Sequence, residues 1–190
     1  GYDTFMEKEI HEQPYVIHET LRMYMDHTQI KIDELDKMDW HFEDFNRVYF
    51  IGCGTAYHAC LYAQYLFDKW LNIPSFCMPA SEFRYGDPKL DKKSLCILVS
   101  QSGETADTLA ALRLAKEKGI TTLAIVNVVG SSIAREADKV FYTLNQLRSQ
   151  MCLDLRFQDW LMLRFIHVQD PKLQLQAPRL IRHSLFCYVY

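Results

Sequence analysis

Hydrophobic residues in this chain gather into short runs, and each run is followed by polar residues or by a stretch with helical spacing. Short apolar runs bounded by turn residues are typical of buried strands. The runs predict strands at residues 47–51, 74–80, 94–100, 121–127 and 139–143.

The segments between these runs carry apolar residues at the spacing of an amphipathic helix. The pattern covers residues 56–70, where Ala, Cys, Phe and Trp recur on one face, and it returns at residues 104–118. Gly119 stands where a helix C-terminal glycine belongs, and residues 131–137 predict a further short helix. Strands that alternate with helices predict an α/β fold, with a parallel sheet covered on both faces and right-handed crossovers.

Length and charge narrow the class of protein. The chain has 190 residues and is 49% hydrophobic, which suits one domain with a real core and leaves room for a terminal extension. The formal net charge is −3, and no long basic run is present, so nucleic acid is not an expected partner. No apolar stretch approaches the ~20 residues of a membrane span, so we expect no membrane either.

The composition changes near residue 143. Every glycine lies at or before Gly130 and every glutamate at or before Glu136, and residues 144–190 carry a net charge of +3. We therefore expect a helical lead-in, a domain and an atypical C-terminal extension, at residues 1–45, 46–143 and 144–190.

The first residues show no secretion signal, because they have neither a basic end nor an apolar centre. The chain does not begin with Met, so we expect an excised or processed piece of a longer protein. Residues 5–25 are rich in helix formers but contain Pro14, which predicts a helical segment in two pieces.

The six cysteines form no C-x-x-C pair, and most have apolar neighbours, where cysteine behaves as a small buried hydrophobe. We interpret them as reduced thiols of a cytosolic protein in preference to a disulfide framework. His58 and Cys60 lie close together, but no second pair at ligand spacing accompanies them, so we expect no metal site.

The candidate chemistry lies in the loop S-Q-S-G-E-T, residues 100–105. It follows a predicted strand and precedes a predicted helix, and open parallel sheets bind ligands beyond the carboxyl ends of their strands. Gly103 permits a tight turn, and the helix start presents unpaired N–H groups. The hydroxyls of Ser100, Ser102 and Thr105 add hydrogen bonds. Together these features predict a phosphate site that needs neither lysine nor metal.

A plainer interpretation stays open, since Ser102 and Thr105 have the spacing of residues that cap a helix. Glu104 is awkward beside an anion, and we expect it to point away from the ligand. A second glycine turn, residues 52–55, also joins a strand to a helix. It lacks the third glycine of a dinucleotide fingerprint, and no Walker pattern is present, so the two turns favour a small phosphorylated ligand.

Five segments of the chain carry a family resemblance. The turns IGCGTA and SQSGET mark sugar-isomerase (SIS) domains generally, whereas MEKEIHEQPYVI and ASEFRYGDP are more specific. Together with NVVGSSIAREAD, they closely resemble the glutamine–fructose-6-phosphate aminotransferases, also called glucosamine-6-phosphate synthases. The resemblance covers roughly residues 2–143 and is to the first SIS subdomain and the segment that leads into it, so residues 46–143 are expected to be that domain.

The resemblance implies an αβα sandwich around a five-stranded parallel sheet. It implies an enzyme that transfers glutamine-derived ammonia to fructose 6-phosphate and isomerises the product to glucosamine 6-phosphate, in the cytoplasm, as a homodimer and without a dissociable cofactor. The sugar phosphate would be held by Ser100, Gln101, Ser102 and Thr105. Thr55 and Ala56 would lie at the sugar; many relatives have serine at the second position, so only a backbone contact remains there.

The resemblance also implies that the chemistry lies in other parts of a parent chain. A glutaminase domain would precede this segment, and a second SIS subdomain would follow it with the catalytic glutamate, histidine and lysine. Residues 144–190 lack the small-residue loop that the family has after the last strand. Near the predicted site the sequence offers hydroxyls, an amide, Cys53 and His58. Of these, only the imidazole of His58 is a type of group suited to base work, and we expect it in the first turn of a packed helix. We therefore predict that this chain binds fructose 6-phosphate without converting it.

Two other functions stay open: a non-catalytic SIS module that senses a sugar phosphate, and a free-standing phosphosugar isomerase. The tryptophans are expected in the core or at an interface, and His11 and His18 on a shared surface face. Glu82 and Arg84 are candidates for an ion pair at a subunit contact.

Overall fold

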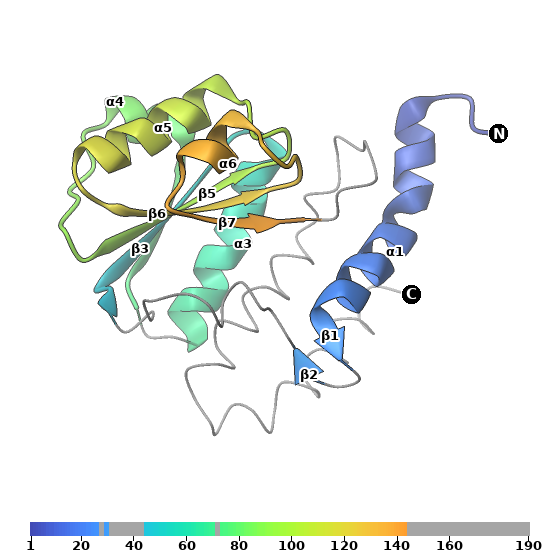
Figure 1. Ribbon diagram of the computed structural model, residues 1–190, viewed down its shortest axis with the longest axis horizontal. Helices are drawn as coiled ribbons and strands as arrows, with labels where there is room; N and C mark the ends of the chain where they lie inside the picture. The colour runs from blue at the N-terminus through green and yellow to red at the C-terminus, as the bar shows by residue number, and fades with distance from the viewer. Residues whose placement is uncertain (27–28, 31–43, 71–72, 144–190) are drawn as a thin grey trace.

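A five-stranded parallel sheet lies at the centre of the structure, a computed structural model that describes residues 1–26, 29–30, 44–70 and 73–143 (Figure 1). The strand order is β4-β3-β5-β6-β7. The strands are Arg47–Gly52 (β3), Ser75–Pro79 (β4), Ser94–Ser100 (β5), Thr121–Val126 (β6) and Lys139–Tyr142 (β7). Each of the predicted strands is confirmed, and every neighbouring pair is parallel.

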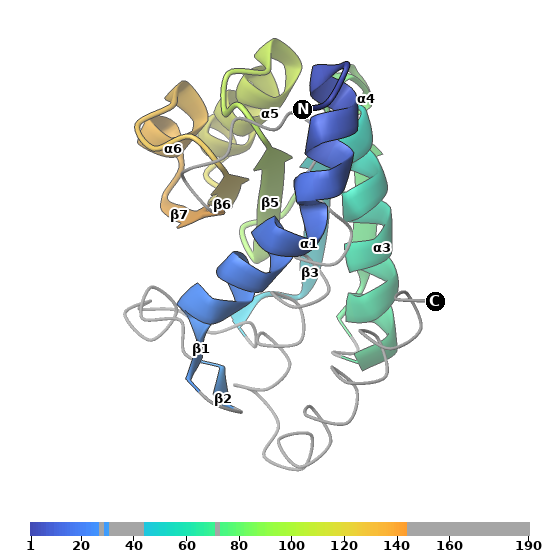
Figure 2. The same ribbon diagram turned by 90° about the vertical axis from the view of Figure 1, so that its right-hand side faces the viewer.

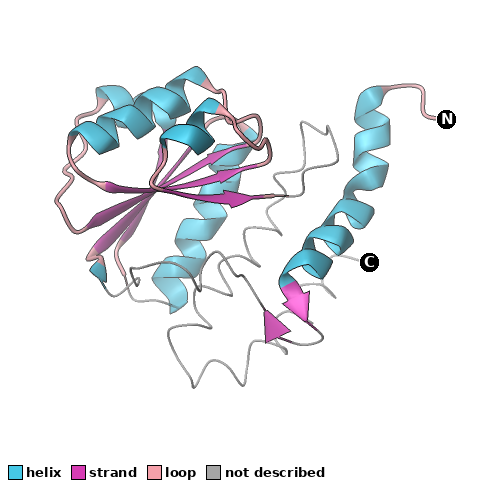
Figure 3. Cartoon of the chain, viewed as in Figure 1, coloured by secondary structure: helices cyan, strands magenta, loops and turns pink. Residues whose placement is uncertain are grey.

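Helices cover both faces of this sheet, which confirms the predicted three-layer α/β fold. Helix α3 (Thr55–Trp70) packs on one face, and the other face carries α4 (Ala80–Tyr85), α5 (Ala106–Glu117) and α6 (Ser132–Glu136) (Figure 1). From β3 onward, strands and helices alternate along the chain. Figure 3 shows the strands in the middle, with helices on either side of them. The sequence analysis did not predict α4, because it assigned Ala80, the first residue of this helix, to the end of the preceding strand.

The core lies on both sides of the central strand. All seven residues of β5 are buried, as expected for a strand that is covered on both faces. Phe50 of β3 meets Phe67 of α3 edge-on, with ring centroids 5.0 Å apart. On the other face Leu98 packs in one cluster with Leu112 of α5. Burying side chains of this size stabilises the fold by about 1.5–3 kcal/mol each.

Helix α5 ends as its sequence predicts. Gly119 has φ 70° and follows the C-cap residue. Its N–H donates to the carbonyl of Lys116 at 2.9 Å, and the N–H of Ile120 donates to Ala115 at 3.0 Å. This pair of bonds is the Schellman motif, in which glycine takes the left-handed conformation without steric cost.

The N-terminal segment corrects one prediction. The helical lead-in is one helix, α1 (Phe5–Tyr24), with Pro14 inside it, and not two pieces. A proline removes one intrahelical hydrogen bond and crowds the preceding turn, which bends a helix that is otherwise well formed. Figure 2 shows α1 bending along its course. Two short strands follow, Met25–Asp26 (β1) and Gln29–Ile30 (β2), which pair antiparallel.

The C-terminal extension expected at residues 144–190 lies outside the described residues, as do Trp40 and Trp160. Trp70 is the last residue of α3. In the described part of the chain, no helix has the length and apolar character needed to cross a membrane.

Candidate functional site

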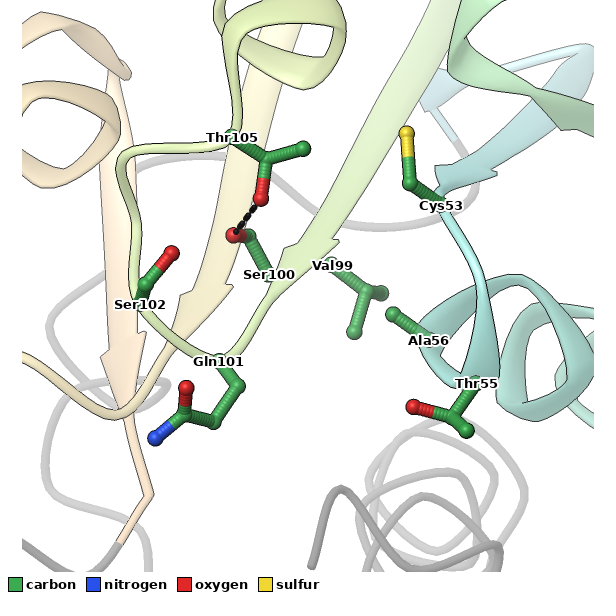
Figure 4. A pocket seen from close by; sticks show the side chains of 8 residues that line it. All are labelled: Cys53, Thr55, Ala56, Val99, Ser100, Gln101, Ser102 and Thr105. Atoms are coloured by element: carbon green, nitrogen blue, oxygen red, sulfur yellow. Dashed lines mark hydrogen bonds between the residues drawn. The ribbon is translucent and has the colours of Figure 1, made fainter. Parts of the chain in front are cut away.

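The two predicted turns meet at one edge of the sheet. Strands β3 and β5 are neighbours, and Gly52 at the end of β3 pairs with Val99 near the end of β5. The turn that follows β3 and the loop that follows β5 therefore face each other across a cavity of about 300 Å³ (Figure 4). Its lining consists of Cys53, Thr55, Ala56, Val99, Ser100, Gln101, Ser102 and Thr105.

All six residues singled out by the sequence line this cavity. The sequence did not select Val99, which belongs to β5, or Cys53, which lies between the two glycines of the first turn. Val99 could have been found from its position in the sequence, because it stands at the end of the strand that leads into the loop at residues 100–105. Cys53 Sγ lies 3.5 Å from Thr108 Oγ1, so this thiol links the turn after β3 to helix α5.

The hydroxyl of Ser100 makes two contacts within the loop at residues 100–105. Its Oγ accepts a hydrogen bond of 3.1 Å from the backbone N–H of Gly103 and lies 3.1 Å from Thr105 Oγ1 (Figure 4). Two hydroxyls have two hydrogens, and their mutual bond uses one of them. One hydroxyl hydrogen of this pair thus remains to donate to a ligand in the cavity.

Ser102 offers a second donor. Its Oγ accepts a hydrogen bond of 3.2 Å from the backbone N–H of Glu104, which leaves its own hydrogen for another acceptor. Thr105 is the N-cap residue of α5, but its side chain makes no capping bond in the described part of the chain. The capping interpretation of these hydroxyls therefore finds no support in the geometry, and the first N–H groups of α5 have no side-chain partner from this residue.

Gly103 is the tightest point of the loop. It is buried, has φ 66°, and its carbonyl accepts a hydrogen bond of 3.0 Å from the N–H of Ile133 in α6. A Cβ at this position would lie 2.0 Å from Ser131 Oγ. Ser131 Oγ is buried and has no hydrogen-bond partner among the described residues. The loop is thus packed directly against the start of α6.

Glu104 points away from the cavity, as predicted. Its carboxylate accepts a hydrogen bond of 2.7 Å from the backbone N–H of Ser132, and Glu104 does not line the cavity. This bond is the main reason why the pKa of Glu104 lies below its ordinary value. The carboxylate of Glu104 therefore accepts a hydrogen bond at the start of α6, whereas its sequence position suggested an interaction with the first turn of α5.

The first turn is built differently. Gly54 has φ 56°, and a Cβ there would meet nothing within 4 Å. A Cβ at Gly52, in contrast, would lie 3.0 Å from the backbone of Ala56 and Tyr57. Glycine at position 52 thus lets the strand pass close to the start of α3. Ala56 is 6% exposed and presents only a methyl group to the cavity.

Other candidate residues lie outside the cavity. His58 is in the first turn of α3, as predicted, and its side chain is exposed beside the ring of Tyr57. No group of three or more potential metal ligands occurs among the described residues. Cys53, Cys60, Cys77 and Cys96 are free thiols, and burial raises the pKa of Cys96.

Arg84 has a partner within the chain. Its guanidinium lies 3.6 Å from the carboxylate of Asp107 in the first turn of α5 and packs over the ring of Tyr85. The ion pair predicted for Arg84 and Glu82 concerned a subunit contact, and it stays a prediction.

The sequence pattern of the SIS domain family matches residues 41–152, which include the sheet and both turns. The chain belongs to the SIS domain family. This membership accounts for the five-stranded parallel sheet and for the paired turns at its carboxyl edge.

Among curated proteins, the chain is 54% identical over 144 residues to the glutamine–fructose-6-phosphate aminotransferase (isomerizing) of Clostridium tetani. It is 49% identical over 143 residues to the enzyme of the same name from Mycolicibacterium smegmatis. These alignments cover 75% of this chain but only 24% and 23% of the relatives. The chain thus spans about a quarter of the length of the curated relatives it matches.

Solved structures also resemble this chain in fold. The C-terminal domain of glucosamine-fructose-6-phosphate aminotransferase from Francisella tularensis superposes with a TM-score of 0.85 and 29% identity, covering 96% of this chain and 53% of that one. The sugar isomerase domain of an RpiR transcription factor from Sphaerobacter thermophilus has a TM-score of 0.65 and 21% identity, over 94% of this chain and 98% of that one. The second likeness shows the shared fold alone.

Proposed function

We propose that this chain is the fructose 6-phosphate-binding part of the isomerase domain of a glutamine-dependent amidotransferase that makes glucosamine 6-phosphate. The observation that carries the proposal is the cavity, where a hydroxyl-rich loop and a helix start face a glycine turn. The likeness to aminotransferases of that name supports the choice of substrate.

The phosphate group would lie against the loop at residues 100–105. The free hydroxyl hydrogen shared by Ser100 and Thr105, that of Ser102, and the uncapped start of α5 all favour an anion there. The amide of Gln101 lines the same side, as Figure 4 shows. The sugar would extend toward Thr55 and Ala56 across the cavity.

Binding in this cavity positions the sugar phosphate but supplies no proton transfer. Isomerisation moves a proton between adjacent carbons and needs a base and an acid in reach. None of the described lining residues is His, Asp, Glu or Lys. We therefore assign the acid–base groups to a second SIS subdomain, the ammonia supply to a glutaminase domain, and the assembly to a cytoplasmic homodimer, with no dissociable cofactor.

Calorimetry with fructose 6-phosphate tests the binding role. Ser102→Ala should weaken binding by about tenfold or more, since a hydrogen bond to a charged group contributes roughly 1.5–3 kcal/mol. Thr105→Ala should do the same. Ser81→Ala, at an exposed position of α4, is the matched control and should bind as the wild type does. Unchanged affinity in both loop variants would refute the phosphate site.

Turnover separates this role from that of a complete isomerase. The purified chain, incubated with fructose 6-phosphate and ammonia or with glucose 6-phosphate, should show no product by NMR. Sustained turnover that is abolished by His58→Ala would overturn the proposal. Binding without turnover would agree with it.

A further inference from the structure

Glu104 stands within the loop that would bind a phosphate, yet its charge has the sign of the ligand. Its carboxylate accepts a hydrogen bond of 2.7 Å from the backbone N–H of Ser132, at the start of α6. We propose that Glu104 is a positioning residue, which ties the anion-binding loop to α6 and keeps its own charge out of the cavity. This inference rests on the proposed function and adds a residue that does not touch the ligand.

The bond from Glu104 belongs to a continuous seam between the loop and α6, which we define as residues 103–104 against residues 131–133. The N–H of Ile133 donates to the carbonyl of Gly103 at 3.0 Å. Ser131 fills the space beside Gly103, where a Cβ would lie 2.0 Å from Ser131 Oγ. Backbone, side chain and carboxylate thus hold the same short stretch of the loop.

The seam connects to the ligand through Ser102. The backbone N–H of Glu104 donates to Ser102 Oγ at 3.2 Å, so the orientation of that peptide unit determines which way the serine hydroxyl faces. Holding Glu104 in place keeps the serine oxygen as an acceptor and turns its hydrogen toward the cavity. If the seam loosens, Ser102 loses this fixed orientation and must be ordered again when the ligand binds.

Electrostatics favours the same arrangement. The hydrogen bonds from Ser132 lower the pKa of Glu104, and Arg135 adds a smaller effect, so the carboxylate is ionised at neutral pH. A charge-assisted bond is about twice as strong as a neutral one. A carboxylate without this partner is free to rotate toward the cavity, where it repels a phosphate.

The donor of this bond can be removed with little other change. Ser132 is the first residue of α6, a position where proline is well tolerated because its fixed φ suits the helix. Ser131 before it has φ −61° and ψ 162°, the extended conformation that a residue before proline adopts. Ser132→Pro therefore deletes the N–H together with the hydroxyl, whereas Ser132→Ala keeps the N–H and deletes only the hydroxyl, which accepts from Arg135 and also helps to lower the pKa of Glu104.

The experiment measures fructose 6-phosphate binding to the 190-residue chain by calorimetry. Glu104→Ala and Ser132→Pro should each weaken binding by roughly three- to tenfold, because each removes one end of the same bond. The double variant should bind no more weakly than either single variant, since the two ends act as a unit. Glu104→Gln keeps an acceptor for the N–H and loses the charge, so it should bind at least as well as the wild type.

Two controls exclude a general loss of structure. Ser81→Ala changes an exposed position of α4, and Glu136→Ala breaks an exposed ion pair of α6 with Arg113 that lies outside the seam. Both should bind within about twofold of the wild type. Wild-type affinity in Glu104→Ala, additive losses in the double variant, or weaker binding by Glu104→Gln than by Glu104→Ala would each overturn the inference and leave the proposed function standing. A wild-type chain that binds no fructose 6-phosphate would refute the proposed function, and the inference with it.

Discussion

The two turns at the carboxyl edge of the sheet reach the same cavity with opposite constructions. After β3, the chain passes through Gly54 with φ 56° into α3, and the space where its side chain would stand is empty. After β5, the chain passes through Gly103 with φ 66°, and that space is filled by Ser131. The first glycine is required by backbone conformation alone, whereas the second is required by conformation and packing together.

The difference assigns a separate task to each turn. The turn at residues 52–55 brings a strand close to a helix and leaves Thr55 and Ala56 at the cavity wall. The loop at residues 100–105 carries polar groups whose orientation must be fixed in advance, and its hydrogen bonds and contacts with α6 fix them. Preorganised donors bind an anion better because they do not lose freedom when it arrives.

The largest effect, a loss of stability, is expected when the glycine with positive φ in each of the two turns, Gly54 or Gly103, is replaced by alanine. Gly103→Ala should lower the free energy of unfolding by about 2–4 kcal/mol, from backbone strain and from overlap with Ser131. Gly54→Ala should cost only about 1–2 kcal/mol, because strain acts there without a clash. Urea denaturation of both variants measures the two values.

A double variant sharpens this test. Ser131→Gly removes the side chain that fills the site beside Gly103, so Gly103→Ala in that background should lose the packing part of its cost. Equal destabilisation by Gly54→Ala and Gly103→Ala in the wild-type background would contradict the contrast drawn between the turns.

A smaller effect is expected at the sugar side of the cavity. Ala56→Ser adds a hydroxyl to the cavity wall and should tighten fructose 6-phosphate binding roughly two- to tenfold, the range of a typical hydrogen bond. Calorimetry measures the change. Ala59→Ser is the control, because Ala59 is buried in the same helix but does not line the cavity. A similar gain in both variants would show that the hydroxyl acts without touching the sugar.

The smallest effect is expected from lowering the pH, which should loosen the loop at residues 100–105 but not the turn at residues 52–55. The pKa of Glu104 is lowered by its bonds from Ser132, and that of Glu136 by its pair with Arg113. Burial raises the pKa of Asp138, but hydrogen bonds from Thr122 and Lys116 outweigh it and lower the pKa overall. A carboxylate whose pKa is lowered by folding stabilises the folded state at a pH above its ordinary pKa. This contribution is lost as the pH falls through the pKa that the group has in the folded protein.

The loop that touches α6 should therefore loosen at a pH below about 4.5, the ordinary value for glutamate, while the turn at residues 52–55, which has no carboxylate, should not. Amide hydrogen exchange at Ile133 and at Tyr57 reports on the two turns, since each donates to a glycine carbonyl within them. Glu104→Gln should remove part of the pH dependence at Ile133. Equal acid sensitivity at both amides would count against this assignment.

Much of the site could be predicted because its signals are local. The apolar run at β5 followed by small polar residues placed Ser100–Thr105 at a strand end. Thr55 and Ala56 were named through the family resemblance, and the parallel pairing of β3 with β5 brings them opposite that loop. The seam with α6 could not be predicted, since Glu104 and Ser132 are 28 residues apart and their bond depends on the packing of two helices. The prediction of two helical pieces around Pro14 was wrong for a related reason. A proline is a local signal, whereas the continuity of α1 depends on the helical turns before and after it.

The end of the described chain is linked to the ligand loop. Thr143, just after the edge strand β7, donates through its hydroxyl to the side-chain oxygen of Asn127 at 3.1 Å, and the N–H of Asn127 donates to the carbonyl of Gln101 at 3.2 Å. The N–H of Thr143 also donates to the carbonyl of Val126 in β6 at 2.8 Å. A single residue, Asn127, thus joins the position of Thr143, next to the edge strand, to that of Gln101 in the cavity wall.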